Sequence, residues 1–146
     1  MLLAAAVLKA CALLTAADVA SVLGEKPGKA RETTPRPEVS QCVIALPAAK
    51  SVSLEVTQGA RAAQFASRLR QAAEVEGDEA GDHDEPAVEV VPGLGDEAFW
   101  AAGGGGLYVR RSATLLRMTL GGDESKEAKL GKLRLLADKA LARLAK

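Results

Sequence analysis

The chain has 146 residues, which suits one domain of ordinary size with a core that needs no metal. Its 19 basic and 19 acidic side chains balance, so it lacks the net positive charge typical of nucleic-acid-binding proteins. We therefore expect a single domain over residues 1–146 that binds no nucleic acid.

The first ten residues are apolar apart from Lys9. They are too few to span a membrane, and they lack the basic start of a complete signal peptide. Residues 1–10 are therefore either the remnant of a signal region or a short first helix. One face of that helix would carry Leu2, Leu3, Val7 and Leu8. A lipidated Cys11 is a further alternative, although Lys9 is unsuited to a lipoprotein cleavage site.

The two cysteines are Cys11 and Cys42, and neither has a second Cys or His at the spacing of a zinc site. A disulfide between them would close a loop of about 30 residues and stabilise the domain by roughly 3 to 4 kcal/mol. The alternative is two buried free thiols in a reducing compartment. We favour the disulfide, and we predict no metal site and no cofactor.

A capping box of Thr15 and Asp18 predicts the start of a helix, and Gly24 followed by Pro27 predicts its end. Residues 25–38 contain three prolines, several charges and no periodicity. We expect this segment to be a long surface connection.

Residues 41–46 and 51–57 alternate between apolar and polar side chains, which predicts an antiparallel hairpin with one solvated face. Residues 59–76 then follow the helical period. The expected apolar face of this helix carries Ala62, Phe65, Ala66, Leu69 and Ala73. The opposite face carries Arg61, Gln64, Arg68 and Gln71.

The stretch 91–100 is the expected structural centre, because it holds Phe99 and Trp100 after the alternating residues 87–90. Pro92 and Gly93 suit the central positions of a type II turn. Adjacent strand residues point to opposite faces, so one ring enters the main core and the other lies under a helix or lines a groove. We name Trp100, Phe99 and Tyr108, which lies in the next strand, as candidate ligand-binding residues.

A glycine turn at 103–106 leads to strands near 107–110 and 115–120, and Asp123 or Ser125 caps a last helix. The apolar stripe of that helix is Leu130, Leu133, Ala137, Ala140, Leu141 and Leu144. The predicted fold is α+β, with an antiparallel β-sheet of five or six strands and helices packed on one or both faces. The predicted order is α-ββ-α-βββ(β)-α.

The only histidine, His83, lies in an acidic stretch at 77–85 that we interpret as a solvated loop. Its spacing does not match an EF-hand, which leaves a cation site as the minor alternative. The sequence also lacks the Gly-x-Ser-x-Gly motif of serine hydrolases. We therefore predict no catalytic residues and no enzymatic activity.

Short motifs lie at 11–24, 40–42, 91–99, 107–110 and 140–144. Together they resemble those of a group of small bacterial exported domains of unknown function, typified by actinobacterial lipoproteins. The chain is also similar to the extracellular sensor domain of a mycobacterial serine/threonine kinase. The resemblance implies an antiparallel sheet with flanking helices, a disulfide from Cys11 to Cys42 and an extracytoplasmic location, periplasmic or secreted. It implies no catalytic residues.

The sequence therefore predicts a non-enzymatic, extracytoplasmic ligand-binding or sensor-like domain. Its expected partner is a small apolar ligand or an envelope protein, bound near Trp100 or in a cleft between sheet and helix. The alternative is a structural or protein-interaction module of the bacterial cell envelope. Such a module would have no pocket larger than a few water molecules.

Overall fold

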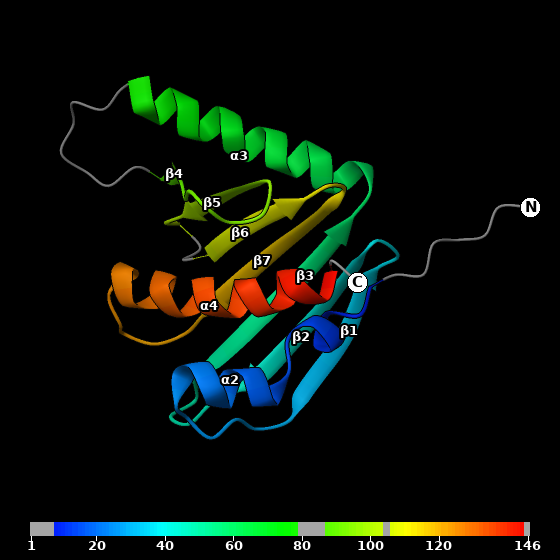
Figure 1. The fold of residues 1–146 in the computed structure, drawn as a ribbon, viewed down its shortest axis with the longest axis vertical. Helices are drawn as coiled ribbons and strands as arrows, with labels where there is room; N and C mark the ends of the chain where they lie inside the picture. Colours follow the sequence, from blue (N-terminus) through cyan, green and yellow to red (C-terminus); the bar gives the residue numbers. More distant parts are fainter. Residues whose placement is uncertain (1–7, 79–86, 104–105, 145–146) are drawn as a thin grey trace, which may run out of the picture.

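One antiparallel sheet of seven strands organises the part of the chain that the computed structural model describes, residues 8–78, 87–103 and 106–144. The strand order is β1-β2-β3-β7-β6-β5-β4, and four helices flank the sheet in the described ranges (Figure 1). The α+β class and the antiparallel pairing confirm the sequence-based prediction. The expected number of five or six strands was too low.

The elements follow in chain order. They are α1 (Ala10–Leu13), α2 (Ala16–Leu23), β1 (Ala30–Arg36), β2 (Val39–Ala45), β3 (Ser51–Gln58), α3 (Ala60–Asp78), β4 (Val88–Val90), β5 (Glu97–Ala101), β6 (Gly106–Arg111), β7 (Thr114–Leu120) and α4 (Lys126–Leu144).

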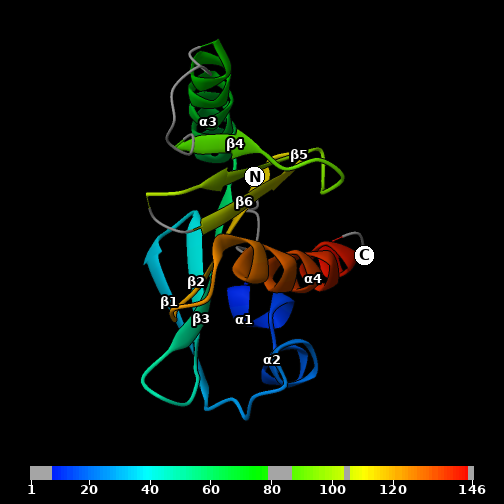
Figure 2. The same ribbon diagram turned by 90° about the vertical axis from the view of Figure 1, so that its left-hand side faces the viewer.

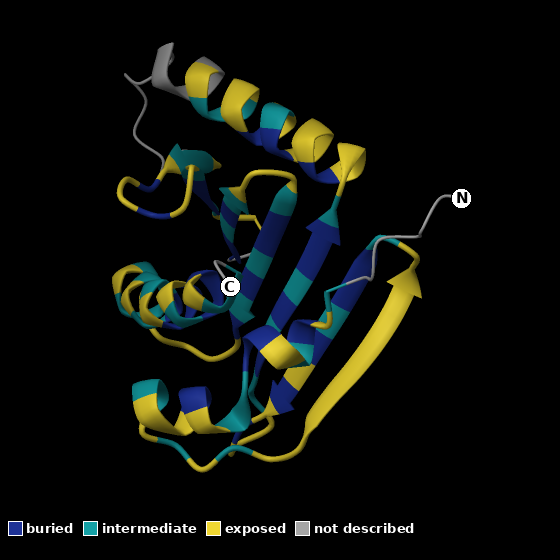
Figure 3. Cartoon of the chain, turned by 45° about the vertical axis from the view of Figure 1, so that its right-hand side comes forward, coloured by how far each residue is buried: buried dark blue, intermediate teal, exposed yellow. Residues whose placement is uncertain are grey.

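Strand β1 corrects the prediction that residues 25–38 form a surface connection. All seven of its residues are exposed, as Figure 3 shows along its length, and it pairs with β2 at the edge of the sheet. Its register shifts between Thr33 and Arg36, next to Pro35. Because an exposed edge strand buries neither face, it has no alternation of apolar and polar residues to reveal it.

One face of the sheet carries the main core. A single row across five strands shows its composition: Cys42, Leu54, Met118, Leu107 and Trp100 are successive cross-strand partners, and all are buried. Helices α1, α2 and α4 cover this face, and Figure 2 shows them gathered on one side of the sheet. The stripe that the sequence predicted for α4 packs here, with Leu133, Ala137, Ala140 and Leu141 buried.

The opposite face is only half covered. Its next row runs through Gln41, Glu55, Arg117, Tyr108 and Phe99. Helix α3 lies over the β4 to β7 side of this face, where it buries a second apolar layer. That layer contains Ala62, Ala66, Leu69, Phe99 and Leu115. The face of β1, β2 and β3 beyond α3 carries polar side chains such as Gln41 and Glu55, together with the exposed Val43.

The disulfide between Cys11 and Cys42 is present and joins α1 to β2, with a Cα–Cα distance of 5.0 Å. Because this bond uses the sulfur of Cys11, neither free thiols nor a lipidated Cys11 is found. Residues 1–7 of the expected first helix lie outside the described residues, and Leu8 precedes α1 without being helical. The capping box of Thr15 and Asp18 is confirmed.

The central stretch is buried as predicted, and its two aromatic rings lie on opposite faces of β5. Trp100 is 3% exposed in the main core, and Phe99 is 2% exposed under α3. Gly93 has a φ of 82°, as the third position of a type II turn requires. Residues 79–86, which include His83, lie outside the described ranges, so the expected acidic loop is not tested there.

Candidate functional site

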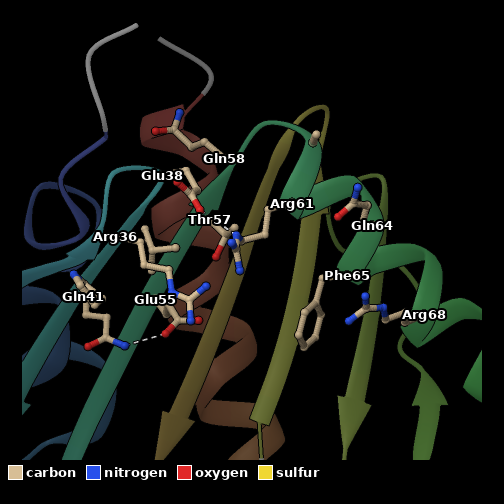
Figure 4. A pocket seen from close by; sticks show the side chains of 13 residues that line it. Arg36, Glu38, Gln41, Glu55, Thr57, Gln58, Arg61, Gln64, Phe65 and Arg68 are labelled. Carbon is tan, nitrogen blue, oxygen red and sulfur yellow. Dashed lines mark hydrogen bonds and ion pairs between the residues drawn. The ribbon is translucent and has the colours of Figure 1, made fainter. Parts of the chain in front are cut away.

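A groove of about 800 Å³ lies between α3 and the uncovered polar face of the sheet (Figure 4). We call it the helix–sheet groove. Its lining residues come from the β1–β2 turn, from β2 and β3, and from the first half of α3. They are Pro35, Arg36, Glu38, Val39, Gln41, Glu55, Thr57, Gln58, Ala60, Arg61, Gln64, Phe65 and Arg68.

The floor of the groove is made by β2 and β3. Gln41 and Glu55 are cross-strand partners, and the Gln41 Nε2 group donates a 2.6 Å hydrogen bond to the Glu55 carboxylate. Thr57 lies one row further along the same face and is buried. Gln41 and Glu55 are polar because no helix covers them, so side chains that interact with water are favoured there.

The wall of the groove is one stripe of α3. Arg61, Gln64, Phe65 and Arg68 are spaced i, i+3, i+4 and i+7, which places them on one side of a helix. Figure 4 shows Phe65 between Arg61 and Arg68. The sequence prediction placed Phe65 on the buried side with Ala62, and this is wrong. Phe65 is 38% exposed, since it sits at the boundary between the apolar layer and the groove.

Aromatic contacts with the sheet hold the Phe65 side chain of the wall in place. The rings of Phe65 and Tyr108 stack with centroids 5.5 Å apart and planes at 19°. The guanidinium carbon of Arg117 lies 5.8 Å from the centroid of the Tyr108 ring, within cation–π range. The Nε of Arg117 is buried and makes no hydrogen bond with the described residues. Because Arg117 is the cross-strand partner of Glu55 in β3, it places a positive charge next to that carboxylate.

The groove carries more positive than negative charge. Its three arginines face two carboxylates, and both carboxylates already have partners. Glu55 accepts from Gln41, and Glu38 pairs with Arg61 at 2.7 Å. Arg36 and Arg68 make no ion pair within the described part of the chain. The groove can therefore neutralise an added negative charge.

The three residues predicted to bind ligand do not converge on this groove. Phe99 and Tyr108 are cross-strand partners on the α3 face, whereas Trp100 lies on the opposite face among core residues. None of the three lines the groove, and Tyr108 reaches it only through its stack on Phe65. A ligand-binding role for Trp100, Phe99 and Tyr108 stays a prediction.

Two clusters of charged side chains elsewhere hold helices in place. Hydrogen bonding from Arg143 keeps the pKa of Asp18 below its usual value, against the opposing effect of burial. On the other face, hydrogen bonding from Arg70, with a further contribution from Arg110, lowers the pKa of Glu97. Both carboxyl groups are therefore held ionised, which suits structural ion pairs.

Within the described ranges, no group of three or more His, Cys, Asp or Glu side chains is placed to hold a metal ion. The described residues also contain no helix with both the length and the apolar content needed to cross a membrane. Comparison with protein-family models, with curated proteins and with solved structures gives no match. The resemblance to exported bacterial domains therefore stays a prediction.

The sequence suggested a cleft between sheet and helix but did not identify the residues of the groove, because most of them are polar and they come from four separate elements, β1, β2, β3 and α3. The one available signal was the stripe Arg61, Gln64, Phe65 and Arg68, in which an aromatic ring is flanked by arginines at helical spacing. That signal is weak by itself, because the solvated face of any surface helix is normally charged.

Proposed function

We propose that this chain is a non-enzymatic, extracytoplasmic ligand-binding or sensor-like domain whose ligand occupies the helix–sheet groove. The observation that carries the proposal is the groove itself. Its volume of about 800 Å³ falls in the range of small-molecule sites, roughly 300 to 1,000 Å³. The alternative, a structural module, was expected to have no pocket larger than a few water molecules.

The lining favours a different ligand from the one that the sequence suggested. We expected a small apolar ligand near Trp100 or in a cleft between sheet and helix, but Trp100 is enclosed in the core, and most of the groove side chains are polar. Phe65 is the largest apolar side chain of the lining, and a ligand in the groove would cover its exposed part. We therefore propose a polar ligand with a limited apolar part.

The disulfide supports the proposed location. Disulfides persist in oxidising compartments, such as the periplasm or the outside of the cell, and are rare in the cytoplasm. The bond between Cys11 and Cys42 is compatible with a domain that acts there.

The groove can be tested with two matched tryptophan substitutions on α3. Gln64 lines the groove, whereas Gln71 is also exposed on the same helix but lies outside the lining. A broad panel of metabolites and envelope fragments is screened by ligand-observed NMR. We expect ligands of the wild-type domain to be lost in Gln64→Trp and kept in Gln71→Trp. Binding that survives in Gln64→Trp, or no binding to any compound, would contradict the proposal.

The second candidate is an envelope interaction module, and strand β1 is the observation that favours it. An edge strand with an unpaired outer side can accept a strand from a partner protein. All of β1 is exposed, although Arg31, Glu32 and Pro35 are residues that discourage such pairing. Cross-linking through a cysteine placed at Thr34, in cells that produce the protein, would capture such a partner.

A further inference from the structure

The charges of the helix–sheet groove are arranged along its length, and this arrangement limits the kind of ligand. Arg61 and Arg68 are seven residues apart on α3, so their backbones are separated by about 10 Å along the helix axis. Arg36 reaches the groove from β1, near Arg61 (Figure 4). Positive charge is thus present at both ends, with Phe65 between them.

Each end of the groove has one arginine that makes no ion pair with the described residues. At one end this arginine is Arg36, because Arg61 is paired with Glu38. At the other end it is Arg68. Arg36 and Arg68 are both exposed, and their guanidinium groups can each bind a carboxylate or phosphate through two parallel hydrogen bonds.

The middle of the groove offers an aromatic surface. Phe65 keeps more than a third of its surface exposed even though its ring stacks on Tyr108. A flat or apolar segment of a ligand that covers Phe65 would remove this apolar surface from water, which is favourable. Three polar side chains of the floor lie beside the edges of such a ligand. They are Gln41, Glu55 and Thr57.

We propose that the groove binds an elongated organic anion, with a carboxylate or phosphate group at each end of a flat or apolar segment. One acidic group binds Arg36, the other binds Arg68, and the central segment covers Phe65. This inference rests on the proposed function, because it names the ligand class of the same groove.

The test uses rigid biphenyl probes and isothermal titration calorimetry on the whole domain. Biphenyl-4,4′-dicarboxylate and biphenyl-4,4′-bisphosphate carry the two kinds of acidic group, and biphenyl-4,4′-dicarboxamide is the neutral control. We expect at least one dianion to bind at least tenfold more tightly than the dicarboxamide. We also expect its affinity to fall as salt rises, because salt screens exposed charges.

Substitution of single arginines locates the binding. Arg36→Gln and Arg68→Gln should each weaken dianion binding about tenfold, since each removes one group that donates charge-assisted hydrogen bonds to the ligand. Arg68→Lys keeps the charge and should lose less. Arg31→Gln is the matched control, because Arg31 is also exposed on β1 and makes no ion pair in the described chain but does not line the groove.

Two results would overturn the inference. One is that no dianion binds more tightly than the dicarboxamide. The other is that Arg36→Gln and Arg68→Gln bind as well as Arg31→Gln does. If neutral ligands bind and Gln64→Trp blocks them, the proposed function stands and only the anionic ligand class is wrong. If the groove variants leave every ligand unaffected, both proposals fail.

Discussion

Arg143 and Asp18 form a two-pronged ion pair that joins the last turn of α4 to the first turn of α2. The Nη2 and Nη1 groups of Arg143 donate to the two carboxylate oxygens of Asp18 at 2.9 and 2.5 Å. The same Nη1 also donates to the carbonyl of Leu13 at 2.6 Å. Since Asp18 also caps α2, the ion pair joins α2 to α4, and Arg143 adds a hydrogen bond to the end of α1.

Replacing Asp18 by Asn should destabilise the domain. The amide keeps an acceptor for the Thr15 backbone N–H but loses the charge that Arg143 pairs with. We expect a loss of about 2 kcal/mol, below the roughly 3 to 5 kcal/mol of a fully buried pair, because the Arg143 side chain is 33% exposed. Urea unfolding at pH 7 measures it. Asp138→Asn, an exposed position on α4, is the control and should change little.

The same pair predicts how stability depends on pH. Because Arg143 lowers the folded-state pKa of Asp18 below the unfolded value of about 3.9, its stabilisation is fully present well above that value. It is lost as the pH falls through the folded-state pKa. Glu97 acts in the same direction. Unfolding free energies measured from pH 7 to pH 2 should therefore drop below about pH 4, and less steeply in Asp18→Asn. An identical acid profile for both proteins would contradict this assignment.

Removal of the disulfide should cost much of the net stability. The double variant Cys11→Ala with Cys42→Ala frees a loop of about 30 residues and should lose roughly 3 to 4 kcal/mol. Reductant should have the same effect on the wild type and none on the double variant. A loss below about 1 kcal/mol would show that the loop is already constrained in the unfolded state.

Two glycines predict opposite effects of the same substitution. A Cβ at Gly95 would lie 2.6 Å from the Arg110 carbonyl oxygen and 2.7 Å from Val109 Cγ1, at a φ of 54°. Gly95→Ala should therefore lose about 2 kcal/mol or more. Gly131 lies within α4, and a Cβ there would meet no atom within 4 Å. Gly131→Ala should gain up to about 1 kcal/mol. Thermal unfolding of both variants checks the two signs.

Trp100 is an internal reporter that separates the two possible ligand sites. Since it is 3% exposed on the core face, its emission should resist quenching by acrylamide. A ligand in the helix–sheet groove should leave that emission unchanged, because the sheet separates the two. A ligand that quenches Trp100 in proportion to binding would favour the site predicted from the sequence instead.

Much of the fold was accessible from the sequence because burial leaves a periodic pattern. Strands β2, β3 and β7 and helix α4 each bury one face. The structure confirms the alternation predicted for the strands and the apolar stripe predicted for the helix. The capping box at Thr15 and the turn at Gly93 were also predicted, since each depends on local chemistry. Strand β1 was missed because it buries no side chain and leaves no pattern.

The site was not accessible in the same way. The groove depends on how far α3 extends across the sheet, and this follows from long-range packing of Ala62, Ala66 and Leu69. Phe65 illustrates the difficulty. Its position on the helix is next to the buried stripe, so the helical period placed it in the core. In the structure one side of its ring stacks on Tyr108, and more than a third of the residue stays exposed.

The charged side chains of the groove, Arg36, Arg61 and Arg68, stand on a surface that neither apolar layer uses. If the proposed ligand occupies the groove, changes at these positions should alter its binding while leaving the scaffold intact. The groove can therefore be redesigned in the laboratory without repacking the interior.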